Sequence, residues 1–161
     1  MLPLEGDRKP LLLLGSNHSE RWPVLSPDGR WLAYLSDESG RPEVYVQSFP
    51  RPGSGKWQIS TEGGGEPVWA RNGRELFYRN GYKLMAVPVQ TQPVFTPGKP
   101  QVLFEWPYEA MDGVRPNYDV TPDGQRLLMI KATEGNAAPA QINLILNWSE
   151  ELRRRDAAQK K

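Results

Sequence analysis

The sequence contains no cysteine, and His18 is its only histidine. A chain without cysteine has no disulfide framework, no thiolate metal site and no cysteine nucleophile. A metal site built on several histidines, and most histidine-based triads, would need residues from another chain. We therefore expect no bound metal and no cofactor.

Long apolar runs and an excess of one charge are also missing. The longest apolar run, Leu11–Leu14, is far too short to cross a membrane. The start of the chain, MLPLEGDRKP, lacks the basic and apolar pattern of a signal peptide. Lys plus Arg total 20 and Asp plus Glu total 19, so the net charge of +1 argues against a nucleic-acid-binding domain. We expect neither nucleic acid nor membrane insertion among the interactions of this chain.

Glycine and proline are abundant instead, with 15 Gly and 16 Pro in 161 residues, alongside 6 Trp, 6 Tyr and 4 Phe. Such a composition is typical of many short strands joined by turns. The length is that of one domain.

Three similar segments repeat along the chain and align without gaps on an Asp-Gly or Asn-Gly pair. They are WPVLSPDGRWLAYL (22–35), EPVWARNGRELFYR (66–79) and NYDVTPDGQRLLMI (117–130). Asp28, Asn72 and Asp123 hold equivalent positions, at spacings of 44 and 51 residues. Each segment predicts a β-hairpin, because Asp or Asn bonds nearby backbone amides in a turn and Gly supplies a positive φ. We interpret the three acidic or amide side chains as turn residues rather than metal ligands.

More strands are predicted after each hairpin. Third strands are expected at 44–46, 84–89 and 142–148, and fourth strands at 57–60 and 102–104. Four antiparallel strands in about 45 residues match the size of one propeller blade. The last unit has no fourth strand, whereas Pro10–Leu14 predicts a spare strand at the other end of the chain.

The hairpins SPDGRWLAY and TPDGQRLLM resemble the PD-type, WD-like repeats of TolB-like six-bladed propellers. Segments such as ESGRPEVYVQSFP and GGGEPVWARNGRELFY resemble the C-terminal propellers of bacterial serine/threonine kinases and the C-terminal repeats of TolB-like periplasmic proteins. The resemblance covers about residues 2–148. It implies an all-β propeller fold with three four-stranded antiparallel blades per chain, half of a six-bladed ring. It also leans towards bacteria and an extracytoplasmic site, although the sequence itself leaves the compartment open.

We divide the chain into a three-blade propeller half, residues 1–148, and a polar basic tail, residues 149–161. The fourth strand of the last blade is expected from about residues 10–14 of the same chain or of a partner. Three blades cannot close a ring, so the chain is either a piece of a longer protein or a free-standing half-propeller. In the second case two copies would close one six-bladed ring as a homodimer.

Catalytic motifs are missing from the sequence, which has neither a GxSxG elbow nor an HExxH motif. We expect a protein or small molecule to bind at the mouth of the central channel, where the first strand of each blade begins. The residues that enter these strands are Glu20, Arg21, Trp22, Glu66, Arg115 and Asn117. Mixed charge beside an exposed aromatic residue is typical of a binding rim.

The leading interpretation is a non-catalytic module for protein–protein or ligand recognition. One alternative is a sensor or scaffold propeller from a membrane-anchored bacterial serine/threonine kinase. Another is a hydrolase or lyase that works in the channel. Three roles stay open for the insert Glu105–Val114: capping the channel, contacting another chain, or folding back on its own blade.

Overall fold

The computed structural model describes residues 9–10, 12–51, 53, 55–107, 116–131 and 141–146. Within these ranges the chain is all-β and forms twelve strands. None of the described ranges forms a helix with the length and hydropathy of a membrane span. The predicted tail at 149–161 and most of the insert at 105–114 lie outside the described residues.

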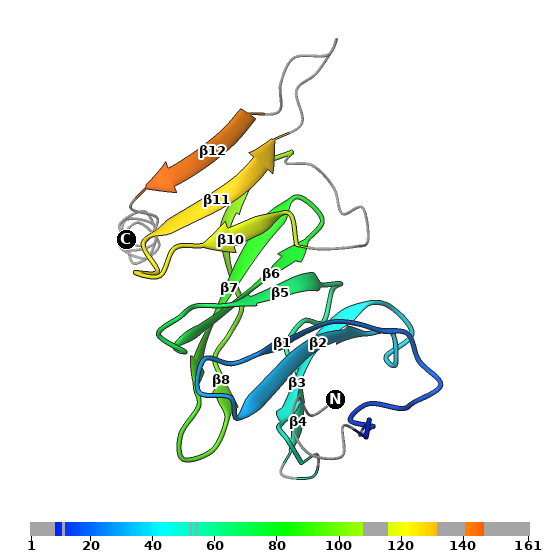
Figure 1. The fold of residues 1–161 in the computed structure, drawn as a ribbon. Coiled ribbons are helices and arrows are strands. Elements are labelled where there is room, and N and C mark those ends of the chain that lie inside the picture. The colour runs from blue at the N-terminus through cyan, green and yellow to red at the C-terminus, as the bar shows by residue number, and fades with distance from the viewer. Residues whose placement is uncertain are drawn as a thin grey trace, which may run out of the picture.

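The strands form three antiparallel sheets, which are the three predicted blades (Figure 1). Blade 1 has the order β1 (Glu20–Leu25), β2 (Trp31–Ser36), β3 (Glu43–Ser48) and β4 (Lys56–Gln58). Blade 2 contains β5 (Gly65–Trp69), β6 (Glu75–Asn80) and β7 (Lys83–Gln90), and β7 pairs with both β8 (Thr96–Pro97) and β9 (Gln101–Glu105). Blade 3 contains β10 (Tyr118–Val120), β11 (Arg126–Lys131) and β12 (Gln141–Leu146).

The three predicted hairpin turns are confirmed. In each turn the glycine has a φ of 66° to 68°, and its N–H donates to the carbonyl three residues earlier. Oδ1 of Asp28, Asn72 and Asp123 accepts a hydrogen bond from the N–H two residues later, at 3.2, 2.9 and 3.0 Å. The Thr121 hydroxyl and the Gln125 N–H hold the pKa of Asp123 below its usual range. These side chains thus serve their own turns, as the sequence predicts.

Strands β1 and β5 contain an irregularity that the repeat pattern did not predict. Trp22 and Glu66 both have a φ of 52°, and the pairing shifts register beside each of them. Each is followed by a proline, Pro23 or Pro67, which has no N–H to offer a neighbouring strand. In β10 Tyr118 stands in place of the proline, and the register runs on without a shift.

Aromatic side chains fill the seam between blades 1 and 2. The rings of Trp31, Trp57 and Phe95 pack with centroids 5.0, 5.2 and 5.5 Å apart. Trp69 Nε1 in blade 2 donates to the Val24 carbonyl in blade 1 at 3.2 Å. The seam therefore combines apolar burial with a directed contact that fixes how the two sheets face each other.

Strand β6 contributes to both seams. Leu76 and Tyr78 belong to the core shared with blade 1, whereas Phe77 belongs to the core shared with blade 3. Leu127 and Met129 of β11 fill the blade 3 side of that second core. This explains the nearly continuous apolar runs in the sequence, because a strand covered on both faces has no polar side.

Among the described residues, two apolar side chains of β11 are exposed on the side of blade 3 that faces away from blade 2, which we call the open side of blade 3. Leu128 and Ile130 are 42% and 37% exposed there. In the alignment of the repeats Leu128 holds the position of Ala33 and Phe77, which are both 0% exposed. Blade 3 therefore exposes the surface that, in blades 1 and 2, is buried against the next blade.

The outer side of blade 1 carries a cluster of Leu32, Tyr34 and Tyr45, and Leu14 packs against it. At the seam between blades 1 and 2, the fourth-strand residue Trp57 packs against the core in the same way. Leu14 thus occupies the position that a residue from the fourth strand of a preceding blade would occupy.

The predicted strand at Pro10–Leu14 is not formed within this chain, because residues 10 and 12–14 are not in a strand. The physical reason is that this segment lies far from the strand with which it was expected to pair. Leu14 packs on blade 1, whereas β12, the strand it was to join, ends blade 3. Pairing of this segment with another copy of the chain stays a prediction.

Candidate functional site

Each sheet has two ends, which we name after the chain segments that connect its strands there. The turn side holds the three hairpin turns, which lie together at the left of Figure 1. The linker side holds the connections at 37–42 and 81–82 and the link between blades at 59–64. The residues predicted to form a binding rim enter β1, β5 and β10 on the linker side.

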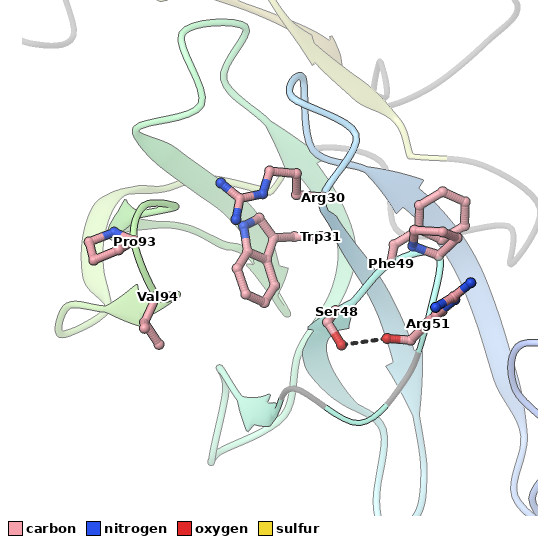
Figure 2. A pocket seen from close by; sticks show the side chains of 8 residues that line it. Arg30, Trp31, Ser48, Phe49, Arg51, Pro93 and Val94 are labelled. Atoms are coloured by element: carbon pink, nitrogen blue, oxygen red, sulfur yellow. Dashed lines mark hydrogen bonds between the residues drawn. The ribbon is translucent and has the colours of Figure 1, made fainter.

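A hollow of about 510 Å³ opens on the turn side of the seam between blades 1 and 2, and we call it the turn-side hollow (Figure 2). Its lining residues are Arg30, Trp31, Ser48, Phe49, Pro50, Arg51, Pro93 and Val94. In Figure 2 Pro93 and Val94 lie to one side of Trp31, and Phe49 and Arg51 lie to the other.

A second hollow, of about 360 Å³, opens at the opposite end of the same seam, and we call it the linker-side hollow. Its lining residues are Arg41, Pro42, Gly63, Gly64, Gly65, Arg79, Asn80, Gly81 and Tyr82. Tyr82 is 57% exposed, and Trp106, 51% exposed, lies beside it because the Trp106 N–H donates to the Tyr82 carbonyl at 3.1 Å. The contact holds the start of the insert against its own blade.

Glu66 joins the first strands of blades 2 and 3. Its Oε2 accepts a hydrogen bond from Asn117 N at 2.9 Å, and its carbonyl accepts one from the Tyr118 hydroxyl at 2.6 Å. Burial, with the Glu66 carboxylate nearby, raises the pKa of Tyr118 well above its usual value, so the hydroxyl remains a donor. The structure thus brings two predicted rim residues together at a buried seam. Arg115, predicted beside them, lies outside the described residues.

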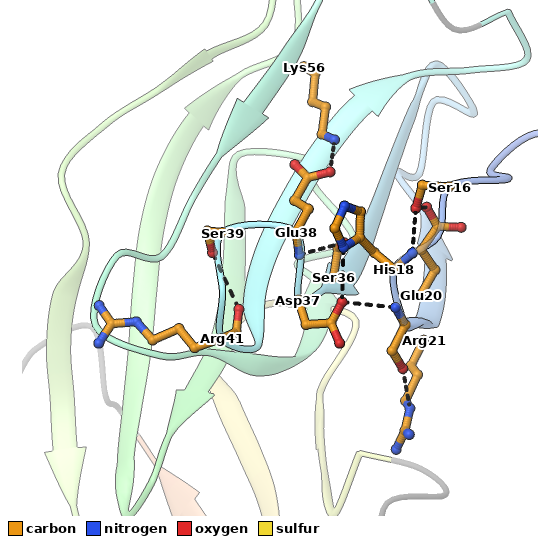
Figure 3. Close-up of polar contacts among 11 residues, drawn as sticks. Ser16, His18, Glu20, Arg21, Ser36, Asp37, Glu38, Ser39, Arg41 and Lys56 are labelled. Carbon is orange, nitrogen blue, oxygen red and sulfur yellow. Dashed lines mark hydrogen bonds and ion pairs between the residues drawn. The ribbon is translucent and has the colours of Figure 1, made fainter.

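Glu20 and Arg21 enter blade 1 at the linker side and bond within their own loop (Figure 3). The Ser16 hydroxyl donates to Glu20 Oε1 at 2.9 Å, and Arg21 Nε donates to the Ser19 hydroxyl at 3.1 Å. Trp22 follows them, half-buried, at its positive φ. Contact of these residues with a ligand stays a prediction.

His18 lies in the same loop and contacts Asp37. Its Nδ1 is 3.6 Å from Asp37 Oδ1, which also accepts a hydrogen bond from Ser19 N at 2.9 Å (Figure 3). The histidine and Glu66 therefore belong to different polar networks. No group of three or more His, Asp or Glu side chains within the described ranges is arranged to hold a metal ion.

Glu43 holds the link between blades 1 and 2. This buried carboxylate accepts hydrogen bonds from Arg41 Nε at 2.7 Å and from Gly63 N at 2.9 Å, and the Ser60 hydroxyl donates to its other oxygen. A Cβ on Gly64 would lie 2.4 Å from the Ser60 hydroxyl oxygen, so only glycine fits at this position. The glycine run therefore serves a tight connection between blades, and it forms one wall of the linker-side hollow.

Removing the Glu43 carboxylate should weaken this connection. We expect Glu43→Ala to lower the free energy of unfolding by about 2–4 kcal/mol, because a buried hydroxyl and a backbone N–H lose their acceptor. Glu43→Gln keeps an acceptor oxygen and should lose less. Urea unfolding followed by tryptophan fluorescence measures both variants. Equal losses would mean that the hydrogen bonds of Glu43 do not stabilise the link.

Tyr78 makes the stability of the blades dependent on alkaline pH. Burial, with the Glu43 and Glu62 carboxylates, raises the pKa of Tyr78 from 10.0 to about 12. Between these values the unfolded chain loses the phenol proton and the folded chain keeps it, so the stability present below pH 10 falls as the pH approaches 12. We expect Tyr78→Phe to remove on the order of 2 kcal/mol of this loss. Urea unfolding on both sides of pH 10 measures it, and an identical loss in the variant would contradict the assignment.

No protein-family model and no curated protein matches this chain. Among solved structures, TolB from Acinetobacter baumannii is similar with a TM-score of 0.57 and 16% identity, over 83% of this chain and 30% of that chain. An oligogalacturonate lyase from Vibrio parahaemolyticus gives a TM-score of 0.55 and 17% identity, over 73% and 31%. An oligogalacturonate lyase in complex with manganese gives 0.52 and 16%, over 71% and 29%.

These similarities show the fold. The chain is built of TolB-like β-propeller blades, as the repeated hairpins imply. It spans about 30% of the length of the TolB structure and of the two lyase structures.

Proposed function

We propose that this chain of TolB-like propeller blades is a non-catalytic recognition module that binds a protein segment or a small molecule on its linker side. The observation that carries the proposal is the linker-side hollow, which the exposed Tyr82 lines; the backbone of the exposed Trp106 bonds the Tyr82 carbonyl. Tyr, Trp and Arg are the residues that most often dominate binding energy at interfaces. Arg41 lines the same hollow, and the predicted rim residues Glu20 and Arg21 lie on the same side.

The polar networks support a non-catalytic role. A hydrolase or lyase working in the channel would need an acid and a base converging on one point. His18 contacts Asp37 in an exposed loop, whereas the Glu66 carboxylate is buried against Asn117 of the next blade. The single histidine and this rim carboxylate therefore each have a structural partner and belong to different polar networks.

In this proposal two copies of the chain close one six-bladed ring. Leu128 and Ile130 on the open side of blade 3 meet the cluster of Leu32, Tyr34 and Tyr45 on the outer side of blade 1 of the second copy. The position of Leu14 supports the arrangement, because it already packs where a preceding blade would contribute its fourth strand. Closed two-fold dimers are the commonest oligomers, and the same contact forms at both seams.

Fragment binding followed by NMR tests the recognition role. Isotope-labelled protein is titrated with a set of chemically diverse small molecules. We expect amide shifts to concentrate at Gly63–Gly65, at Asn80–Tyr82 and at Trp106, and Tyr82→Ala to weaken binding by about tenfold or more. The control Val102→Ala removes an exposed side chain from the outer strand β9 and should leave binding unchanged. Shifts scattered evenly over the surface would contradict the proposal.

A further inference from the structure

The turn-side hollow is lined by apolar and polar residues together, and it lies beside the aromatic seam of blades 1 and 2. Trp31, buried in the seam, forms part of its lining together with Pro50 and Pro93, whereas Phe49, which borders the hollow, packs against the outer cluster of blade 1. Val94 lines it as well and is 57% exposed. The apolar part of such a hollow accepts a large side chain, since aromatic and aliphatic groups gain most from leaving water.

Two arginines border this hollow, and their backbones are fixed. The Arg30 carbonyl accepts a hydrogen bond from Phe49 N at 2.8 Å, and the Arg51 carbonyl accepts one from the Ser48 hydroxyl at 2.8 Å. The side chains themselves are exposed. Among the described residues the ion pairs join His18, Arg41 and Lys56 to acidic groups, and neither Arg30 nor Arg51 is among them.

The surroundings of the hollow are also basic. Arg71 and Arg74 are exposed on the hairpin turn of blade 2, on the same side of the molecule. The acidic residues on this side, Asp28, Glu75 and Asp123, are fewer than its arginines, which are Arg30, Arg51, Arg71, Arg74 and Arg126. Asp28 accepts hydrogen bonds from the Ser26 hydroxyl and from Arg30 N, and Glu75 is half-buried at the start of β6. The turn side therefore presents positive charge around the hollow, although the whole chain has a net charge of only +1.

We propose that the turn-side hollow binds an acidic peptide segment of a partner protein. An apolar side chain of the segment enters beside Trp31, between Pro50 and Val94, and its flanking carboxylates bind Arg30 and Arg51. Guanidinium groups hold carboxylates through paired, charge-assisted hydrogen bonds. A peptide fits better than a lipid surface or a nucleic acid. Lipid surfaces and nucleic acids bind broad basic faces and do not insert a single apolar side chain into a hollow. This site is independent of the proposed linker-side binding, since the two hollows open at opposite ends of the seam.

Fluorescence anisotropy with the full chain tests the proposal. The probe is a labelled peptide in which one phenylalanine is flanked on both sides by aspartate and glutamate. We expect a Kd on the order of 10 μM that weakens as salt is added. Arg30→Gln and Arg51→Gln should each raise the Kd about tenfold or more. The control Arg126→Gln removes the same charge at the start of β11, the middle strand of blade 3, and should leave the Kd unchanged.

Several outcomes would overturn the proposal. One is the absence of peptide binding at millimolar concentration. Others are equal binding by the arginine variants, or equal binding of a peptide whose acids are replaced by asparagine and glutamine. Binding to anionic phospholipid vesicles or to a single-stranded oligonucleotide in place of the peptide would also reject it. The exposed arginine variants are compared with the parent chain by circular dichroism, so that a loss of binding is not confused with a loss of fold.

Discussion

Replacing Leu128 by Asp is expected to convert the proposed dimer into monomers while each chain keeps its fold. Leu128 lies on the open side of blade 3 and is 42% exposed in the single chain. A ring of two copies would bury this side chain at both seams. Losing a buried leucine costs about 1.5–3 kcal/mol per seam, so the dimer should dissociate about a hundredfold to ten-thousandfold more readily.

Light scattering after size exclusion measures this effect. The control is Val102→Asp, which puts the same charge at a side chain of similar exposure, 39%, on the outer strand β9. It should leave the mass of the parent chain unchanged. If Leu128→Asp also leaves the mass unchanged, the open side of blade 3 is not an interface between copies.

Replacing Phe77 by Ala is expected to destabilise the chain itself by about 3–5 kcal/mol. Phe77 holds the same position in its repeat as Leu128, but it lies in a closed seam and is 0% exposed. Its ring fills the core shared with Leu127 and Met129 of blade 3. The alanine variant leaves a cavity between two blades that cannot easily move together, because other contacts fix the seam.

Urea unfolding of Phe77→Ala gives the size of the loss. The informative comparison is with Leu128→Ala at the equivalent position, which should cost the single chain far less because its side chain is half exposed. Similar losses in the two variants would show that the blades do not share a common packing scheme. The contrast therefore tests whether the repeats are equivalent in structure as well as in sequence.

The hairpins were the part of the fold that the sequence predicted best. Their geometry is local: a glycine with positive φ and an Asp or Asn that bonds the second following N–H are enough to form the turn. The register shifts at Trp22 and Glu66 were missed, although the proline after each residue is visible in the sequence. The first two repeats have this proline and the register shift. The third repeat has Tyr118 in place of the proline, and its register does not shift.

The candidate site was harder to predict, because its residues come from unlike segments. Arg41 lies in a loop of blade 1 and Tyr82 lies in a tight turn of blade 2, and only the packing of the two blades joins them. The rim prediction assumed that the first residues of each blade face the channel. For Glu66 the next blade is close enough to bury the carboxylate, and sequence spacing alone does not show that distance.

Small-angle X-ray scattering of the full chain tests the central claim most directly, because it gives both mass and shape. The account predicts a mass of twice 18.2 kDa. It also predicts a radius of gyration of about 20 Å, the value for a compact body of twice 161 residues. A mass of 18.2 kDa at every concentration, or a doubled mass with a clearly larger radius, would contradict a closed ring of two half-propellers.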